Sequence, residues 1–138
     1  MRQASGTLLV TAPRQGLHLI TDAVAGWVAG QGVGEGLLTL MIRHTSASLL
    51  IQENAAPAAR RDLENWLARI APESRDFEHD DEGPDDMPAH LRSVLTATTL
   101  SIPVQDGRMR LGTWQGIYLC EHRRQPSGRE IAAHLLGA

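Results

Sequence analysis

Lysine is absent from this 138-residue chain, whose thirteen basic residues are all arginine. Without a lysine amine no Schiff base can form on a side chain, which excludes lysine-anchored pyridoxal and aldolase chemistry. Cysteine is nearly absent as well, since Cys120 stands alone and cannot form a disulfide within the chain. This usage is typical of a reducing compartment, and we expect a cytoplasmic protein.

Long apolar runs are also missing: none approaches the eighteen residues of a membrane helix, and the apolar patch near the N-terminus is too short for a signal peptide. Aromatic residues make up only 4% of the chain, and no basic stripe is interleaved with them. We therefore expect neither a membrane nor a nucleic acid as partner. With 42% hydrophobic residues, the length suits one globular domain spanning residues 1–138.

Hydrophobic periodicity and turn residues predict a mixed α+β chain. Helical spacing predicts helices after Thr21, from Pro57 to about Ile70, and from Pro88. Asp106-Gly107 is a tight hairpin signal, and the four β segments of the last forty residues favour an antiparallel sheet. The predicted strands cover residues 3–12, 16–20, 37–43, 98–105, 108–122 with a central Gly-rich break, and 130–136.

Acidic residues are concentrated in one predicted loop. Residues 73–86 contain eight of the sixteen acids and one base, Arg75, so the remainder carries twelve arginines against eight acids. Such a run is usually a solvated surface. However, Phe77 and His79 lie inside it, and a loop of this length in a compact domain is often functional.

Histidines are the main candidates for chemistry. His44 continues the face of Leu38, Leu40 and Ile42, where an imidazole is either a hydrogen-bonded core residue or the floor of a pocket. Four histidines have carboxylates or hydroxyls nearby in the sequence: His44, His79, His90 and His122. Three imidazoles would suit a zinc-like ion, whereas oxygen ligands from Asp85, Asp86 or Glu121 would suit magnesium or manganese.

A nucleophile is not apparent. Ser46 and Ser48 lack the G-x-S-x-G elbow of hydrolases, and Cys120 lies in the middle of a predicted strand, where most cysteines are inert.

Three sequence blocks carry a family resemblance. They are HTSASLLIQEN at 44–54, EHDDEGPDDMPAH at 78–90 and GTWQGIYLCEHR at 112–123. In content, order and spacing they resemble the YjbQ family, also called the secondary thiamine-phosphate synthase family. The resemblance implies a small α+β protein with an antiparallel β-sandwich and two to three short helices, assembled as a homotrimer. It also implies a histidine-lined metal site between subunits and a weak activity that joins hydroxymethylpyrimidine diphosphate to thiazole phosphate.

The expected roles combine this resemblance with side-chain chemistry. We expect a divalent metal ion on His44, His79 and His90, proton transfer by His122 or Glu121, and a small phosphorylated molecule as ligand. Its contacts are expected from Ser46, Arg92, Gln115 and Arg123, since arginine grips phosphate through paired hydrogen bonds. Arg129, which stands beside Glu130, departs from the family pattern. The alternative is a trimer that binds a metal ion or small anion and has another physiological role.

Overall fold

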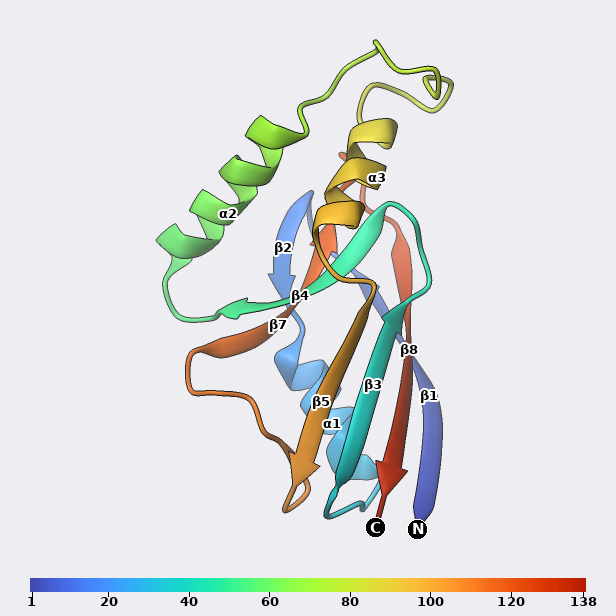
Figure 1. Ribbon diagram of the computed structural model, residues 1–138, viewed down its shortest axis with the longest axis vertical. Coiled ribbons are helices and arrows are strands. Elements are labelled where there is room, and N and C mark those ends of the chain that lie inside the picture. The colour runs from blue at the N-terminus through green and yellow to red at the C-terminus, as the bar shows by residue number, and fades with distance from the viewer.

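Two antiparallel sheets form the framework in the computed structural model, which describes residues 1–138. The expected α+β fold with antiparallel sheets is confirmed (Figure 1). The larger sheet has the strand order β1 (Arg2–Thr11), β8 (Gly128–Gly137), β3 (Gly36–Ile42), β5 (Thr99–Gln105) and β6 (Arg108–Met109). The smaller sheet has the order β2 (Gly16–Leu19), β7 (Gln115–Glu121) and β4 (Ala47–Glu53).

The main core lies between the two sheets and includes helix α1 (Thr21–Gly30). Alternation along β3 points Leu38, Leu40 and Ile42 inward, where they meet Leu49 of β4 and, from α1, Val24. These side chains are almost completely buried. Full burial of a Leu or Ile side chain stabilises the fold by about 1.5–3 kcal/mol, so this core holds the two sheets together.

Helix α2 (Pro57–Ile70) lies beside the smaller sheet, on the side away from the main core (Figure 1). Pro57 occupies its first turn, where a missing N–H costs no hydrogen bond. The helix packs through Leu63 and Leu67 onto Leu17, Tyr118 and Cys120. Because this second cluster is small, α2 leaves space between itself and the sheet.

Helix α3 (Asp86–Leu95) follows the acidic loop and lies at the end of the molecule where β4 begins and β7 ends (Figure 1). It begins two residues before Pro88, the predicted start. The earlier start places Asp86 on the helix, one turn before His90, and so determines the geometry of the candidate site.

Strand β4 is the element that the sequence did not predict. Ala47, Ser48 and Leu49 are buried in succession, so the segment lacks the alternation of a half-exposed strand. Strands that are covered on both faces have such continuous buried runs. Strand β4 has the core on one side and the His122 region on the other. The predicted hairpin at Asp106-Gly107 is confirmed, since both residues have positive φ between β5 and β6.

No helix combines the length and hydropathy that a membrane span requires.

Candidate metal centre

Asp86 is the centre of a small group of possible metal ligands. Its Oδ2 lies 2.8 Å from Nε2 of His79 in the acidic loop and 3.1 Å from Nε2 of His90, one turn further along α3. The ligand atoms of the three residues lie within 4.8 Å of one another. The sequence pointed to both histidines, while Asp86 was only one of several possible oxygen donors. Two imidazoles and a carboxylate at this spacing could hold a metal ion.

The surrounding contacts orient these ligand atoms. Nδ1 of His90 lies 2.8 Å from the Thr45 carbonyl, which can only accept, so Nδ1 donates to it. Nε2 faces the Asp86 carboxylate at 3.1 Å, where either a second proton on the imidazole or a metal ion can join the two atoms. Arg123 donates from Nη1 to the other carboxylate oxygen, Asp86 Oδ1, at 2.9 Å and so fixes its orientation.

The site is buried at Asp86 and open at the histidines. The Asp86 side chain is 3% exposed, compared with 26% for His90 and 45% for His79. Burial opposes ionisation of Asp86, but its hydrogen bond to His79 and the charges of His90 and Arg123 outweigh this and lower its pKa. The same hydrogen bond raises the pKa of His79. Asp86 is therefore an ionised carboxylate, a metal ion would displace a proton from His79, and the histidine side of the group is accessible.

Arg123 and Arg124 hold the acidic loop against the end of β7. Arg123 donates from Nε to Asp85 at 3.0 Å and from Nη2 to the Glu82 carbonyl at 2.9 Å. Arg124 pairs with Glu73 at the start of the loop. These contacts give Arg123 a positioning role toward Asp86, whereas the sequence suggested contact with phosphate.

His44 stands apart from this group of three. Its Nε2 accepts a hydrogen bond from the Glu130 N–H at 2.8 Å, and burial together with Arg129 lowers its pKa. It shares with His90 a shallow groove of about 340 Å³, but its lone pair is already occupied. Of the three histidines expected at the metal, the structure therefore brings two together.

Glu121 and Arg129 form an ion pair inside the protein. Glu121 has no exposed surface, and Arg129 donates to its two oxygens at 2.6 and 2.8 Å. Arg129 also donates to the backbone carbonyl of Ser46. Glu121, expected to transfer protons, is thus enclosed in an ion pair, and no local pattern indicated its partner eight residues along the chain.

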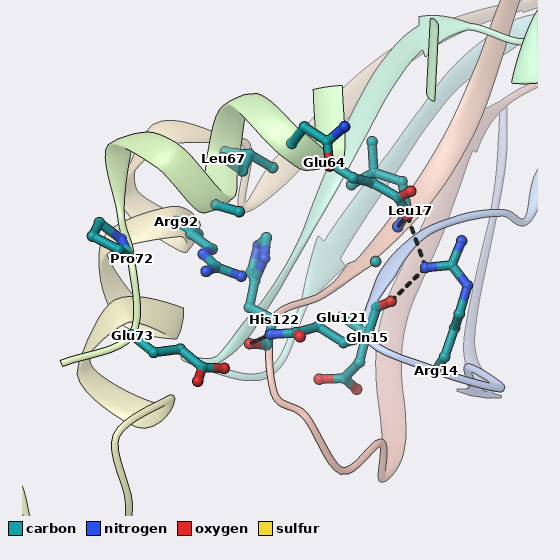
Figure 2. A pocket seen from close by; sticks show the side chains of 13 residues that line it. Arg14, Gln15, Leu17, Glu64, Leu67, Pro72, Glu73, Arg92, Glu121 and His122 are labelled. Atoms are coloured by element: carbon teal, nitrogen blue, oxygen red, sulfur yellow. Dashed lines mark hydrogen bonds and ion pairs between the residues drawn. The ribbon is translucent and has the colours of Figure 1, made fainter. Parts of the chain in front are cut away.

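The other expected ligand contacts do not meet in one place. Arg92 and His122 lie in a cavity under α2 (Figure 2). Gln115 is at the opposite end of β7, where its side chain accepts from the Gly112 N–H. Ser46 is buried next to Arg129, and Arg123 belongs to the Asp86 group. These residues therefore do not form the single substrate pocket that was expected.

The profile of the UPF0047 YjbQ-like proteins matches residues 6–138 of this sequence. The chain belongs to the UPF0047 (YjbQ-like) family. It is 46% identical over 137 residues to a UPF0047 protein from Synechocystis, a match that covers 99% of this chain and 93% of the relative. It is also 46% identical over 132 residues to UPF0047 protein YjbQ from Escherichia coli, covering 95% and 96% of the two chains.

Solved structures support the same family fold. A crystal structure of a YbjQ-like protein of unknown function from Sulfolobus solfataricus superposes with a TM-score of 0.90 at 26% identity, covering 99% of both chains. A conserved hypothetical protein from Thermus thermophilus superposes with a TM-score of 0.84 at 37% identity, covering 95% of this chain and 99% of that one.

These comparisons correct the expected activity. The relatives are named only as UPF0047 or YjbQ proteins, the Sulfolobus protein is described as of unknown function, and none of these names points to thiamine-phosphate synthesis. The expectation of that activity is therefore wrong. The geometry agrees, because the residues expected to hold its two substrates are divided among separate places in the fold.

Proposed function

We propose that this UPF0047 protein binds a divalent transition-metal ion through His79, Asp86 and His90. The main support is the arrangement at His90, where Nδ1 donates to the Thr45 carbonyl and Nε2 faces an oxygen of the Asp86 carboxylate at 3.1 Å. A metal ion satisfies both atoms and the Nε2 of His79 together. Two nitrogens and one oxygen suit zinc, iron(II) or manganese(II) better than magnesium, which prefers oxygen ligands.

The solvent exposure of the three ligands is more typical of a catalytic metal site than of a structural one. Structural zinc sites close the coordination shell with four protein ligands, whereas catalytic sites offer about three and leave a position open. Here three protein ligands converge, and the side chain of His79 is 45% exposed. An ion in such a site supplies Lewis acidity to a water or to an oxygen of a bound substrate.

Calorimetric titration with Zn²⁺ tests the proposal. We expect one ion per chain, and we expect His90→Ala and Asp86→Asn to weaken binding by about a hundredfold, because each removes a direct ligand. His18→Ala is the matched control, since His18 contacts the Arg14 carbonyl far from Asp86 in the sequence and the fold. Equal zinc affinity in the wild type and both ligand variants would refute the proposal.

We also propose that the chain assembles as a homotrimer through the outer face of the larger sheet. Leu37, Met41 and Leu136 are all more than 40% exposed on this face. The register places them among neutral neighbours on β8, β3 and β5: Ala132, His134, Thr39, Thr99, Ser101 and Pro103. A second copy of the chain can cover these rows without burying a formal charge, which favours self-association.

A further inference from the structure

A polar cavity of about 390 Å³ lies between α2 and the smaller sheet. The start of β2, the end of β7 and the inner side of α3 complete its walls, and Figure 2 shows Arg92 and His122 lying next to each other at its centre. Along α3, Arg92 lies two residues after His90, which places it on a different side of the helix from the candidate metal ligands. The cavity is therefore a separate site.

The carboxylates that line this cavity already have cationic partners. Glu64 accepts from Arg14 and from the Leu17 N–H, Glu73 pairs with Arg124, and Glu121 pairs with Arg129. Each of the three therefore has a closer cationic partner than Arg92.

Arg92 is a lining charge without a direct ion pair, although Glu73 and Asp85 attract it at longer range. It is 8% exposed and has no carboxylate oxygen within 4.0 Å. Nε and Nη2 donate to the Ala71 carbonyl at 3.1 and 2.9 Å, so three of the five N–H donors of the guanidinium have no protein partner. A buried charge is normally paired, and the cavity is the space from which an anion can reach these donors.

The hydrogen bonds around His122 determine which of its nitrogens is free. Thr96 donates its hydroxyl proton to the Arg92 carbonyl, so its oxygen accepts from Ser48. Ser48 has then used its own proton and must accept from Nε2 of His122 at 2.8 Å. Nδ1 is left as an acceptor, and since it has no protein partner and is not sealed from solvent, it opens on the cavity.

We propose that this cavity binds a small oxyanion that carries an O–H group, with the anionic oxygens on Arg92 and the O–H donating to Nδ1 of His122. Hydrogen phosphate has both features, and so does the phosphate or carboxylate end of a hydroxylated metabolite. The proposal is independent of the metal site, because the two sites share no proposed ligand residue.

Comparing the affinities for phosphate and sulfate tests whether the cavity recognises an O–H group or only attracts anions. At neutral pH hydrogen phosphate carries an O–H and sulfate does not, so sulfate would place a lone pair against Nδ1. We expect saturable phosphate binding by calorimetry with a chelator present, and sulfate binding about tenfold weaker because of this unsatisfied contact. Arg92→Met should weaken phosphate binding by about tenfold or more, whereas Arg69→Met, on the exposed side of α2, should not.

A measurement on the wild-type protein covers the case in which Arg92→Met fails to fold. Adding phosphate should shift the ring NMR signals of His122 and leave those of His134, on the larger sheet, in place. Glycolate, which has a carboxylate next to a hydroxyl, should shift the same signals if the natural ligand is a hydroxy acid. Absence of saturable phosphate binding, equal affinity for sulfate, or shifts confined to residues outside the cavity would each overturn the proposal.

Discussion

Glu121 and Arg129 are charged residues buried against each other. Glu121 has no exposed surface, and Arg129 is 5% exposed. The two charges compensate each other. Removing one of them is therefore expected to reduce the stability of the fold more than removing both. Glu121 accepts in addition from the Arg123 N–H, which links the pair to the residue that orients Asp86.

Removing one member of this pair should destabilise the fold strongly. We expect Glu121→Gln or Arg129→Met to lower the free energy of unfolding by about 3 kcal/mol, because each leaves an uncompensated buried group. The double variant Glu121→Gln with Arg129→Met should lose less than the sum of the two single losses. Urea unfolding measures all three, and additive losses would contradict the paired description.

His122 should make stability depend on pH. Burial, reinforced by the charges of Arg92 and Arg129, lowers its pKa to about 3. Below about pH 6.5 the unfolded chain binds a proton at this imidazole and the folded chain does not, so the free energy of unfolding decreases as the pH falls. Between pH 7 and pH 5 this contribution is about 2 kcal/mol.

The variant His122→Asn isolates this contribution. It should be less stable than the wild type at pH 7, and the difference should narrow by about 2 kcal/mol at pH 5, since asparagine does not titrate. The contributions of His18 and His44 are the same in both proteins, so they cancel in the difference between the two unfolding free energies. Parallel stability curves from pH 7 to pH 5 would show that His122 can be protonated within the fold.

Among the single residues, His79 and His90 were predicted from the sequence as metal ligands, but their shared contact with Asp86 was not. Both lie in a block rich in carboxylates, which marked them as candidates. His44 was expected with them because it continues a buried stripe, yet its hydrogen bond to the Glu130 N–H depends on how β8 pairs with β3. That pairing joins residues more than eighty positions apart, so no local pattern reveals it.

At the scale of the element, most strands and helices follow directly from local patterns, and the exceptions lie next to the sites. The N-terminal strands, β5, the Asp106-Gly107 hairpin and α2 agree with their sequence signals. Strand β4 is buried on both sides and lacks alternation, and α3 begins before the proline that usually marks a helix start. Strand β4 supplies Ser48, which contacts His122 of the cavity, and α3 supplies Asp86 of the candidate metal centre, so the missed features support both sites.

Close packing of β3 against β8 should make Gly36 sensitive to substitution. A Cβ added there would overlap the Leu136 carbonyl oxygen, which belongs to the sheet backbone and cannot rotate away. We expect Gly36→Ala to lower the unfolding free energy by about 1–3 kcal/mol. Gly26→Ala is the matched control, since a Cβ in the middle of α1 meets nothing within 4 Å and should stabilise by about 0.5–1 kcal/mol. Thermal unfolding of both variants shows whether each change stabilises or destabilises the fold. A Gly36→Ala variant as stable as the wild type would contradict the close contact between Gly36 and the Leu136 carbonyl.

In the whole molecule, both candidate sites lie near the end of β7, whereas the outer face of the larger sheet is the proposed assembly surface. The three residues that end β7 and follow it point in three directions: Glu121 to Arg129, His122 to the cavity and Arg123 to Asp86. The outer sheet face carries no part of either candidate site. Assembly through this face would therefore leave both sites open to ligands.

Charged substitutions on the outer sheet face should prevent assembly. We expect the wild type to elute as a trimer in size-exclusion chromatography with light scattering, and Leu37→Arg with Met41→Arg to elute as a monomer, since six buried guanidinium groups cannot be accommodated in a trimer. Ile70→Arg, on exposed α2, is the control and should remain trimeric. A monomeric wild type, or a trimeric double variant, would contradict this assignment.

Anomalous X-ray scattering at the zinc edge, from crystals of the protein loaded with one equivalent of Zn²⁺, tests the metal centre most directly. We expect one peak per chain, about 2.0–2.2 Å from Nε2 of His79, an oxygen of Asp86 and Nε2 of His90. The same crystals would show whether Nδ1 of His90 still contacts the Thr45 carbonyl. A zinc peak at His18 or His134, with none beside Asp86, would show that His79, Asp86 and His90 do not form a metal centre.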